Sequence, residues 1–305
     1  MSARVVVIGD ALIDELRDDR GVREFVGGAA LNVAVGLTRL SVPTTLIAMV
    51  GDDEAGAHIR TYLADYGVEL IASPSAHGSS RAVSTRNATG EPVYEFNAAA
   101  QARSITFGEA ERAAIDAAAL VAVSCFPFDD AAQTGRFAEA VHASSAILAI
   151  DPNPRAGMLA DREEFVRGFE RLASRAALVK VGEDDATLLY DQPLDALRAR
   201  LLDLGAAAVL ATEGSAGATI EAGDTVVTRP ISDLPGRIVD TMGAGDAAFA
   251  AAIAALVDEA PADEDEWGAI LERAMDVAAA TCRYEGALLR LPESLSAVDM
   301  DAIGT

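Results

Sequence analysis

The sequence contains a single lysine, Lys180, among its 305 residues. A phosphate-binding loop of the Walker type requires a lysine followed by serine or threonine, and no such pair occurs here. Protein kinases carry a lysine on an early strand, whereas the amino-terminal half of this chain has none. Both of these ways of holding ATP are therefore excluded. If the chain binds ATP, it does so by another route.

Histidine and cysteine are also scarce. The three histidines, His58, His77 and His142, are far apart and lack metal-ligand spacing, which argues against a zinc site and a histidine-based triad. The two cysteines, Cys125 and Cys282, lie in apolar segments. They are typical of buried thiols, so we expect a cytoplasmic protein without a disulfide framework.

The sequence is also poor in positively charged residues and in long apolar runs. Lysine and arginine together number 24 against 48 aspartates and glutamates, which gives a net charge of −24. A surface this acidic repels a phosphate backbone, so we exclude nucleic acid as a partner. The apolar runs are interrupted well before the roughly 20 residues that span a bilayer. The first residues enter a strand without a signal-peptide pattern, so we expect no membrane partner either.

What the sequence does contain is a regular alternation of short β-branched runs with alanine- and leucine-rich segments. The apolar runs are nearly continuous, as expected for strands covered on both faces of a parallel sheet. The alternation predicts an α/β fold with a doubly wound, mostly parallel central sheet and helices on both faces. The predicted strands are Val5–Ile8, Thr44–Val50, Leu120–Val123, Ala146–Ile150, Leu178–Val181 and Ala207–Ala211, and the predicted helices include Ala29–Leu40, Asp53–Tyr66, Ala131–Ala143 and Asp161–Ala173.

Two segments, about 11–26 and 79–97, interrupt this rhythm. Each contains alternating residues around a turn signal, Asp18–Gly21 in the first and Asn87–Pro92 in the second, which is typical of a β-hairpin. The hairpins either form a small second sheet that covers the strand ends as a lid, or are two unrelated surface hairpins. Without a low-complexity linker, we expect one α/β domain over residues 1–305 with the lid inserted into it.

Four polar clusters follow predicted strands. The carboxyl ends of parallel strands lie along one edge of a sheet, where ligands bind, so we expect the clusters to converge. Carboxylates suit sugar hydroxyls, and an arginine suits a phosphate or an acidic substrate group. Plainer explanations stay open, namely a helix cap for Asp10 and a surface salt bridge for Arg155. The clusters are Asp10 with Asp14, Asp151–Arg155 with Asn153 inside it, Gly182–Asp185, and Thr212–Gly217 with Gly214 inside it.

The most informative segment is Asp240–Phe249, which places glycines and one carboxylate at the start of an apolar helix. Free N–H groups at a helix N-terminus, aided by its dipole, hold an anion. Asp246 is placed to take a proton from an alcohol, as phosphoryl transfer to a hydroxyl requires. A buried helix with a glycine-rich start is the plainer reading. Gly27 and Gly28 before another helix would let a ligand approach the backbone near Asn32, although a tight turn would look the same.

At these residues the chain resembles the ribokinase-type (PfkB) family of carbohydrate kinases. Gly27–Leu40 is similar to the family's amino-terminal signature, and Asp240–Asp246 is similar to its carboxy-terminal signature. The resemblance extends from Val5 to Pro292. Within the family, Gly9–Asp14 and Asp151–Arg155 look most like fructokinases and 2-keto-3-deoxygluconate kinases.

The resemblance implies roles for the polar residues. Asp246 would be the base, and Gly243, Ala244 and Gly245 would form the anion hole. Mg²⁺ of MgATP would be held near Asp185 through water, while a need for K⁺ stays open. The lid often forms a dimer interface in this family, so a homodimer is an expectation here. The substrate side would include Asp10, Asp14, Gly27, Gly28, Asn32 and Arg155, and the nucleotide side would include Asn153, Lys180, Thr212, Gly214 and Gly217.

Three positions depart from the family pattern. The Asn-x-x-Glu motif near the magnesium is replaced by Gly182–Asp185, so Asp185 stands in for the glutamate. Fructokinases commonly carry an arginine after the second lid strand, where this chain has Tyr94–Ala100. A small residue that helps to hold a monovalent cation is replaced near Gly286–Arg290. We expect Arg290 to place its guanidinium near that cation site instead.

These residues predict transfer of the γ-phosphoryl of MgATP to a sugar hydroxyl, most similar to the fructokinase reaction. The acceptor stays open among fructose, 2-keto-3-deoxygluconate, ribose and a nucleoside, although an aromatic content of 5% disfavours a nucleobase pocket. A catalytically silent sugar-binding regulator is the alternative from another class. A NAD-linked dehydrogenase is disfavoured because Gly-x-Gly-x-x-Gly does not follow Val5–Gly9.

Overall fold

Nine strands form the larger sheet of the computed structural model, which describes residues 3–18, 21–86, 92–257 and 259–296. Their order is β13–β12–β11–β10–β9–β8–β1–β4–β5. The pairs from β11 to β5 are parallel, and β12 and β13 form an antiparallel edge. The strands are β1 (Val5–Gly9), β4 (Thr44–Met49), β5 (Glu69–Ser73), β8 (Leu120–Ser124), β9 (Ile147–Asp151), β10 (Leu178–Gly182), β11 (Val209–Thr212), β12 (Ala218–Ala222) and β13 (Thr225–Arg229).

The central strand β1 explains why the sheet is covered on both faces. Val5 and Val7 belong to one buried apolar cluster, while Val6 and Ile8 belong to another. Successive side chains of a strand point to opposite faces, so a continuous apolar run needs burial on both. The predicted doubly wound architecture is confirmed.

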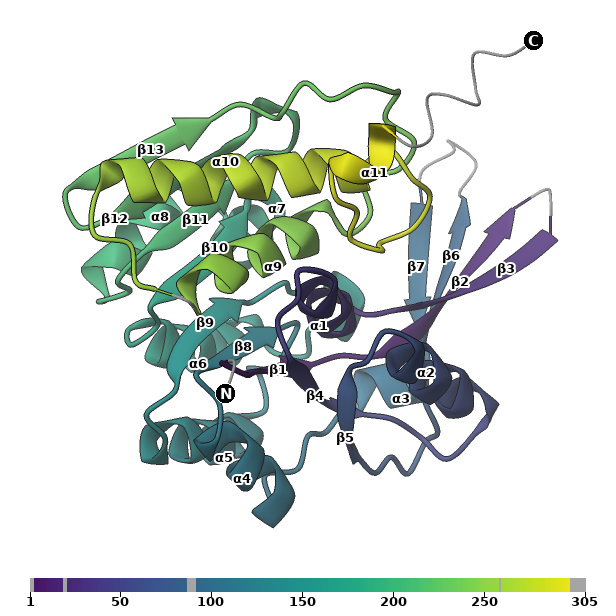
Figure 1. The fold of residues 1–305 in the computed structure, drawn as a ribbon. Coiled ribbons are helices and arrows are strands. Elements are labelled where there is room, and N and C mark those ends of the chain that lie inside the picture. Colours follow the sequence, from purple (N-terminus) through teal and green to yellow (C-terminus); the bar gives the residue numbers. More distant parts are fainter. Residues whose placement is uncertain (1–2, 19–20, 87–91, 258, 297–305) are drawn as a thin grey trace, which may run out of the picture.

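Two layers of helices supply that burial. Helices α1, α2, α9 and α10 pack on one face of the sheet, and α4, α5, α6 and α8 pack on the other. Figure 1 shows α9 and α10 side by side across their face. The helices are α1 (Ala29–Arg39), α2 (Glu54–Asp65), α3 (Ala98–Gln101), α4 (Glu109–Asp116), α5 (Ala131–Ala143), α6 (Arg162–Ala173), α7 (Glu183–Asp185, continued by a π turn at Ala186–Tyr190), α8 (Leu194–Asp203), α9 (Ala244–Leu256), α10 (Glu264–Thr281) and α11 (Glu293–Ser296).

The two predicted hairpins join into one small sheet beside the α/β layers (Figure 1). Its order is β3–β2–β6–β7, and the parallel pairing of β2 with β6 links the hairpins. The alternative of two unrelated hairpins is therefore wrong. Part of each predicted turn, residues 19–20 and 87–91, lies outside the described residues. The strands are β2 (Leu12–Asp18), β3 (Gly21–Gly27), β6 (Ser80–Arg86) and β7 (Pro92–Phe96).

Three strands at the edges of the large sheet were not predicted. β5, β12 and β13 are partly exposed, so their sequences mix polar and apolar residues and lack the continuous runs of the central strands. None of these strands carries a predicted site residue. In the ranges that the structure describes, no helix is long and apolar enough to cross a membrane.

Candidate active site

The predicted polar clusters meet at the carboxyl ends of the strands. Asp10 follows β1, Asp151 ends β9, and Thr212 ends β11. The start of α9 lies at the same place. The charge of Asp246, in the first turn of α9, acts on Asp151 and on Lys180 of β10. Segments that lie more than two hundred residues apart in the sequence therefore build one site.

Asp246 is a buried carboxylate of this site. It lies in the first turn of α9, is 8% exposed, and its Oδ2 accepts a hydrogen bond of 2.8 Å from Nδ2 of Asn32 on α1. Burial raises the pKa of Asp246, while the Asn32 hydrogen bond and the charges of Lys180 and Arg155 oppose the rise. A pKa moved toward neutrality suits a base for proton transfer. The structure thus brings Asp246 and Asn32 together.

The backbone before Asp246 forms a cradle that needs its glycines. Gly243 has φ +75, and a Cβ there would lie 2.6 Å from the Cβ of Ala287. A Cβ on Gly245 would lie 3.2 Å from Nζ of Lys180. The amide N–H groups of Gly245 and Asp246 have no acceptor among the described residues. Free amides at a helix start beside an ammonium group are suited to an anion, although any helix start leaves such amides without an intrahelical acceptor.

Lys180 is held in this position by a carboxylate that was not predicted as a site residue. Its Nζ lies 3.3 Å from both oxygens of Asp151, and both side chains are buried. Burial opposes the charge of Lys180, but Asp151, Asp185 and Asp246 outweigh it and raise the pKa of the ammonium group. Asp151 could have been found from the sequence. It directly follows one predicted buried strand, and the single lysine of the chain lies in the next predicted strand.

Asp10 and Asp14 lie on the substrate side. Oδ1 of Asp10 accepts from the amide of Ala30 at 3.0 Å, so Asp10 does cap α1 through one oxygen. Burial and the charge of Asp10 raise the pKa of Asp14 to about 6, against the effect of Arg155. Because Asp10 caps α1, the plainer reading of this residue is correct for one of its two carboxylate oxygens.

The glycine pair before α1 allows this close packing. A Cβ on Gly27 would lie 2.3 Å from Oδ2 of Asp14. Gly28 has φ +111, and a Cβ there would lie 2.8 Å from the carbonyl oxygen of Asp10. Both glycines are therefore required by the aspartates around them, whether or not a ligand also approaches the backbone.

Arg155 has no ion-pair partner among the described residues, so the surface salt bridge suggested as its plainer explanation is absent there. Its side chain is exposed to solvent. Its charge nevertheless lowers the pKa of five carboxylates, which places it among them. The neighbouring Asn153 adopts φ +38 in the same loop and is partly buried. The five carboxylates are Asp10, Asp14, Asp151, Asp185 and Asp246.

The predicted nucleotide side lies around the ends of β10 and β11. Thr212 pairs with Gly182 in the sheet, and its Oγ1 contacts the carbonyl oxygen of Val181 at 3.4 Å. Gly217 has φ +109, and a Cβ there would collide with the carbonyl of Arg229, so a tight turn alone explains it. Gly214, with φ +54, has open space around it.

Asp185 has the character expected of a residue near Mg²⁺. It is 6% exposed, and its Oδ2 accepts from the amide of Gly182 at 2.7 Å. Burial raises its pKa to about 6, and Lys180 opposes the rise. No group of three or more histidine, cysteine or acidic side chains suited to a metal occurs in the described ranges. Mg²⁺ keeps most of its waters and takes few protein ligands, so one carboxylate with a free oxygen fits a water-mediated contact.

Arg103 was not predicted, yet the structure places it beside Asp10. Its charge lowers the pKa of that carboxylate. The sequence offered no periodic signal for it, because Arg103 lies in an irregular segment after α3.

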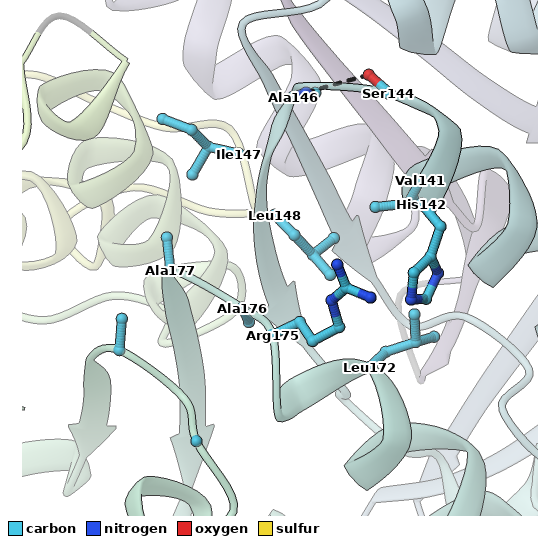
Figure 2. Close-up of a pocket in the computed structure, with 12 residues that line it drawn as sticks. Val141, His142, Ser144, Ala146, Ile147, Leu148, Leu172, Arg175, Ala176 and Ala177 are labelled. Atoms are coloured by element: carbon cyan, nitrogen blue, oxygen red, sulfur yellow. Dashed lines mark hydrogen bonds between the residues drawn. The ribbon is translucent and has the colours of Figure 1, made fainter.

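A cavity of about 330 Å³ lies at the opposite edge of the sheet (Figure 2). It is lined by the amino-terminal ends of β9 to β11 and contains His142 and Arg175. None of the predicted site residues lines it. This cavity is therefore separate from the cluster of buried carboxylates.

Comparisons with known proteins agree with this arrangement. A model described as pfkB family carbohydrate kinase matches residues 2–294. The chain is 30% identical to a fructokinase from Rhizobium leguminosarum bv. trifolii, over 83% of this chain and 79% of the relative. It is 24% identical to an ATP-dependent 6-phosphofructokinase from Thermoanaerobacterium thermosaccharolyticum, over 95% and 91%. A fructokinase structure with bound ATP from Xylella fastidiosa shares the fold, with a TM-score of 0.82 at 20% identity over 99% and 100%.

Proposed function

Since this chain belongs to the pfkB family of carbohydrate kinases, whose members are phosphotransferases acting on sugar hydroxyls, we propose that it transfers the γ-phosphoryl of ATP to a sugar. One observation carries the proposal. Buried Asp246 accepts a hydrogen bond from Asn32 at the start of α9, where its own amide and that of Gly245 have no acceptor among the described residues. A base and an anion cradle in contact are what this reaction requires.

This geometry supports the following roles for the residues. Asp246 accepts the proton of the sugar hydroxyl as the bond to phosphorus forms, which contributes about 10²–10⁴ in rate. The Gly243–Gly245 backbone and Lys180 stabilise the charge on the transferred group. Asp185 would hold Mg²⁺ through water, and the ion would neutralise part of the phosphate charge. The small sheet acts as a lid that excludes water from the reaction.

The remaining site residues divide between the two substrates. Asp10, Asp14 and Asn32, with Gly27 and Gly28 beneath them, accept and orient the sugar hydroxyls. The nucleotide lies toward the other end of the site, and Asn153, Thr212, Gly214 and Gly217 line that side. Residues 1–305 act as one α/β unit carrying the inserted lid, and the lid joins a second copy in a cytoplasmic homodimer.

The relatives favour fructose as the acceptor, since named fructokinases are among them. A specific feature favours a sugar acid as the second candidate. Arg155 acts on Asp10 and Asp14 without an ion-pair partner among the described residues, and a substrate carboxylate would supply one.

Monovalent cations have no role in this proposal. The guanidinium of Arg290 lies 4.4 Å from the ring centroid of Tyr284, in the segment that Asp240 holds through the amide of Gly286. We expect this fixed positive charge to replace the cation. Stimulation by K⁺ similar to that of relatives would contradict this expectation.

The first experiment is an ADP-release assay with MgATP across fructose, 2-keto-3-deoxygluconate, ribose, glucose and adenosine. Turnover on one sugar that is lost in Asp246→Asn supports the kinase and identifies the acceptor. Binding of a sugar by calorimetry without turnover on any acceptor would overturn the proposal in favour of a silent regulator.

A further inference from the structure

One strand of the small sheet carries an arginine on the face that meets the site. In the pairing of β2 with β3, Phe25 lies opposite Asp14, and Arg23 lies opposite Leu16. Side chains of directly opposite residues share a face, as do side chains two residues apart on one strand. Burial and the charge of Asp10 together raise the pKa of Asp14, which places the two carboxylates near each other. Arg23 therefore projects from the face of the small sheet that carries Asp14 toward the site.

An ion pair joins Arg23 to a distant segment of the chain. Its Nη1 contacts Oε1 of Glu285, in the connection between α10 and α11, although 262 residues separate the two. Between residues that the structure describes, this is the only ion pair that links the small sheet to the rest of the molecule. The side chains are 33% and 56% exposed, so the pair adds little to the stability of the fold. It does hold two distant elements in one arrangement.

The residue after Glu285 is tied to the segment that precedes α9. The amide of Gly286 donates to Oδ2 of Asp240 at 3.0 Å. The other oxygen of this carboxylate, Oδ1, accepts from the amide of Met242 at 3.0 Å. One carboxylate therefore connects the segment that contains Glu285 to the turn that leads into the anion cradle.

The next residue along the chain, Ala287, packs on the cradle itself. Gly243 begins the cradle with φ +75, and a Cβ there would lie 2.6 Å from the Cβ of Ala287. Packing this close leaves little room for residues 285–287 to move without displacing Gly243. Three consecutive residues therefore contact, in turn, the small sheet, the turn before the cradle and the cradle.

From these contacts we propose that Arg23 and Glu285 are positioning residues, which couple closure of the small sheet over the sugar to the alignment of the cradle. The inference rests on the proposed kinase activity. When the small sheet covers a sugar, the ion pair fixes residues 285–287, and these fix the backbone whose amides stabilise the transferred group. When the small sheet moves away, the pair breaks and the cradle loses this support, so phosphoryl transfer to water is disfavoured.

The test uses Glu285→Gln, which removes the charge and keeps the shape of the side chain. Amide hydrogen exchange of the ligand-free protein measures the support, and peptides that contain Gly286 and Met242 should exchange faster than in the parent. In the ADP-release assay, kcat/KM for the acceptor that the parent turns over should fall by about two- to fivefold, the size expected of an exposed ion pair. The same substitution should have no further effect in Arg23→Met, because the partner is already absent.

Glu24→Gln is the matched control. Glu24 is next to Arg23 on β3, so its side chain projects from the opposite face of the small sheet. There it pairs with Arg81 at 2.6 Å, within the small sheet. Its loss removes an ion pair of the same kind without touching the connection to the cradle. Hydrogen exchange at the two peptides and kcat/KM should therefore stay within about twofold of the parent.

The outcomes separate positioning from a general effect on the small sheet. Unchanged exchange or unchanged kcat/KM in Glu285→Gln would overturn the inference. An equal effect of Glu285→Gln with and without Arg23, or an equal response in Glu24→Gln, would overturn it as well. Absence of turnover on every acceptor would refute the kinase proposal instead, and hydrogen exchange would then still test whether the ion pair supports the cradle.

Discussion

The two edges of the large sheet differ in the charged side chains that they bury. The carboxyl edge buries Asp10, Asp151, Asp185 and Asp246 around Lys180. The amino edge has a cavity of about 330 Å³, where His142 and Arg175 point toward one another and no carboxylate is among the lining residues (Figure 2). Burying a carboxylate is costly, and a fold without a use for it would replace it. Buried charge, and not cavity size, is therefore the reason that we propose the carboxyl edge as the functional one.

The sharpest test of this difference is Asp246→Asn. Removal of the base should lower kcat by about 10²–10⁴-fold while ATP binding changes little, because the amide cradle is backbone. Turnover and calorimetric binding of ATP measure the two effects separately. Asp203→Asn, an exposed substitution at the end of α8, is the control and should behave as the parent does. Near-normal turnover in Asp246→Asn would show that the base is misassigned.

Lys180→Met tests whether the buried ion pair of Lys180 with Asp151 contributes to the stability of the fold as well as to activity. Leaving Asp151 buried without its partner should cost about 3–5 kcal/mol of unfolding free energy. Urea unfolding measures the loss. The double variant Lys180→Met with Asp151→Leu should regain much of the stability but no activity, because the ammonium beside Gly245 is still missing. Recovery of activity in the double variant would remove Lys180 from the mechanism.

Asp14→Asn tests how much the ionised side chain of Asp14 destabilises the folded protein. The pKa of Asp14 is about 6 in the fold against 3.8 for its ordinary value, so ionised Asp14 destabilises the folded state. That cost is absent below pH 3.8 and complete above pH 6, so the parent loses stability as pH rises through this window. The variant should gain up to about 3 kcal/mol at pH 8, since each pKa unit corresponds to about 1.4 kcal/mol. Urea unfolding at several pH values measures the gain, and a gain independent of pH would contradict the assignment.

Arg175→Met should have the smallest effect. Arg175 is exposed and lines only the cavity at the amino edge, so kcat and KM should stay within about twofold and the unfolding free energy within about 0.5 kcal/mol. The ADP-release assay and urea unfolding measure both quantities. A large change in either constant would mean that the two edges are coupled.

The fold was largely predictable because its signals are local. The apolar runs of the central strands and the alanine-rich helices between them follow from burial on two faces, as β1 shows. The small sheet was predicted as one of two possibilities, and the pairing of β2 with β6 decided between them. The edge strands β5, β12 and β13 were missed because partial exposure mixes polar residues into them.

The site was predictable where chemistry and position coincide in the sequence. Asp246, Gly243 and Gly245 stand at the start of an apolar helix, and Asp10 follows a strand. Asp151 was named in a cluster but given no role, since its pairing with Lys180 joins two strands 29 residues apart. No sequence pattern indicated that Arg103 would lie beside Asp10.

The sequence by itself determined the α/β alternation, the glycine-rich helix starts and the polar residues that follow the strands, because these depend on neighbours along the chain. Only the tertiary structure decided which of these residues meet. The hydrogen bond between Asn32 and Asp246 joins α1 to α9, and the position of Arg103 beside Asp10 depends on how two sheets abut. Such contacts depend on packing between distant segments, which local sequence patterns do not specify.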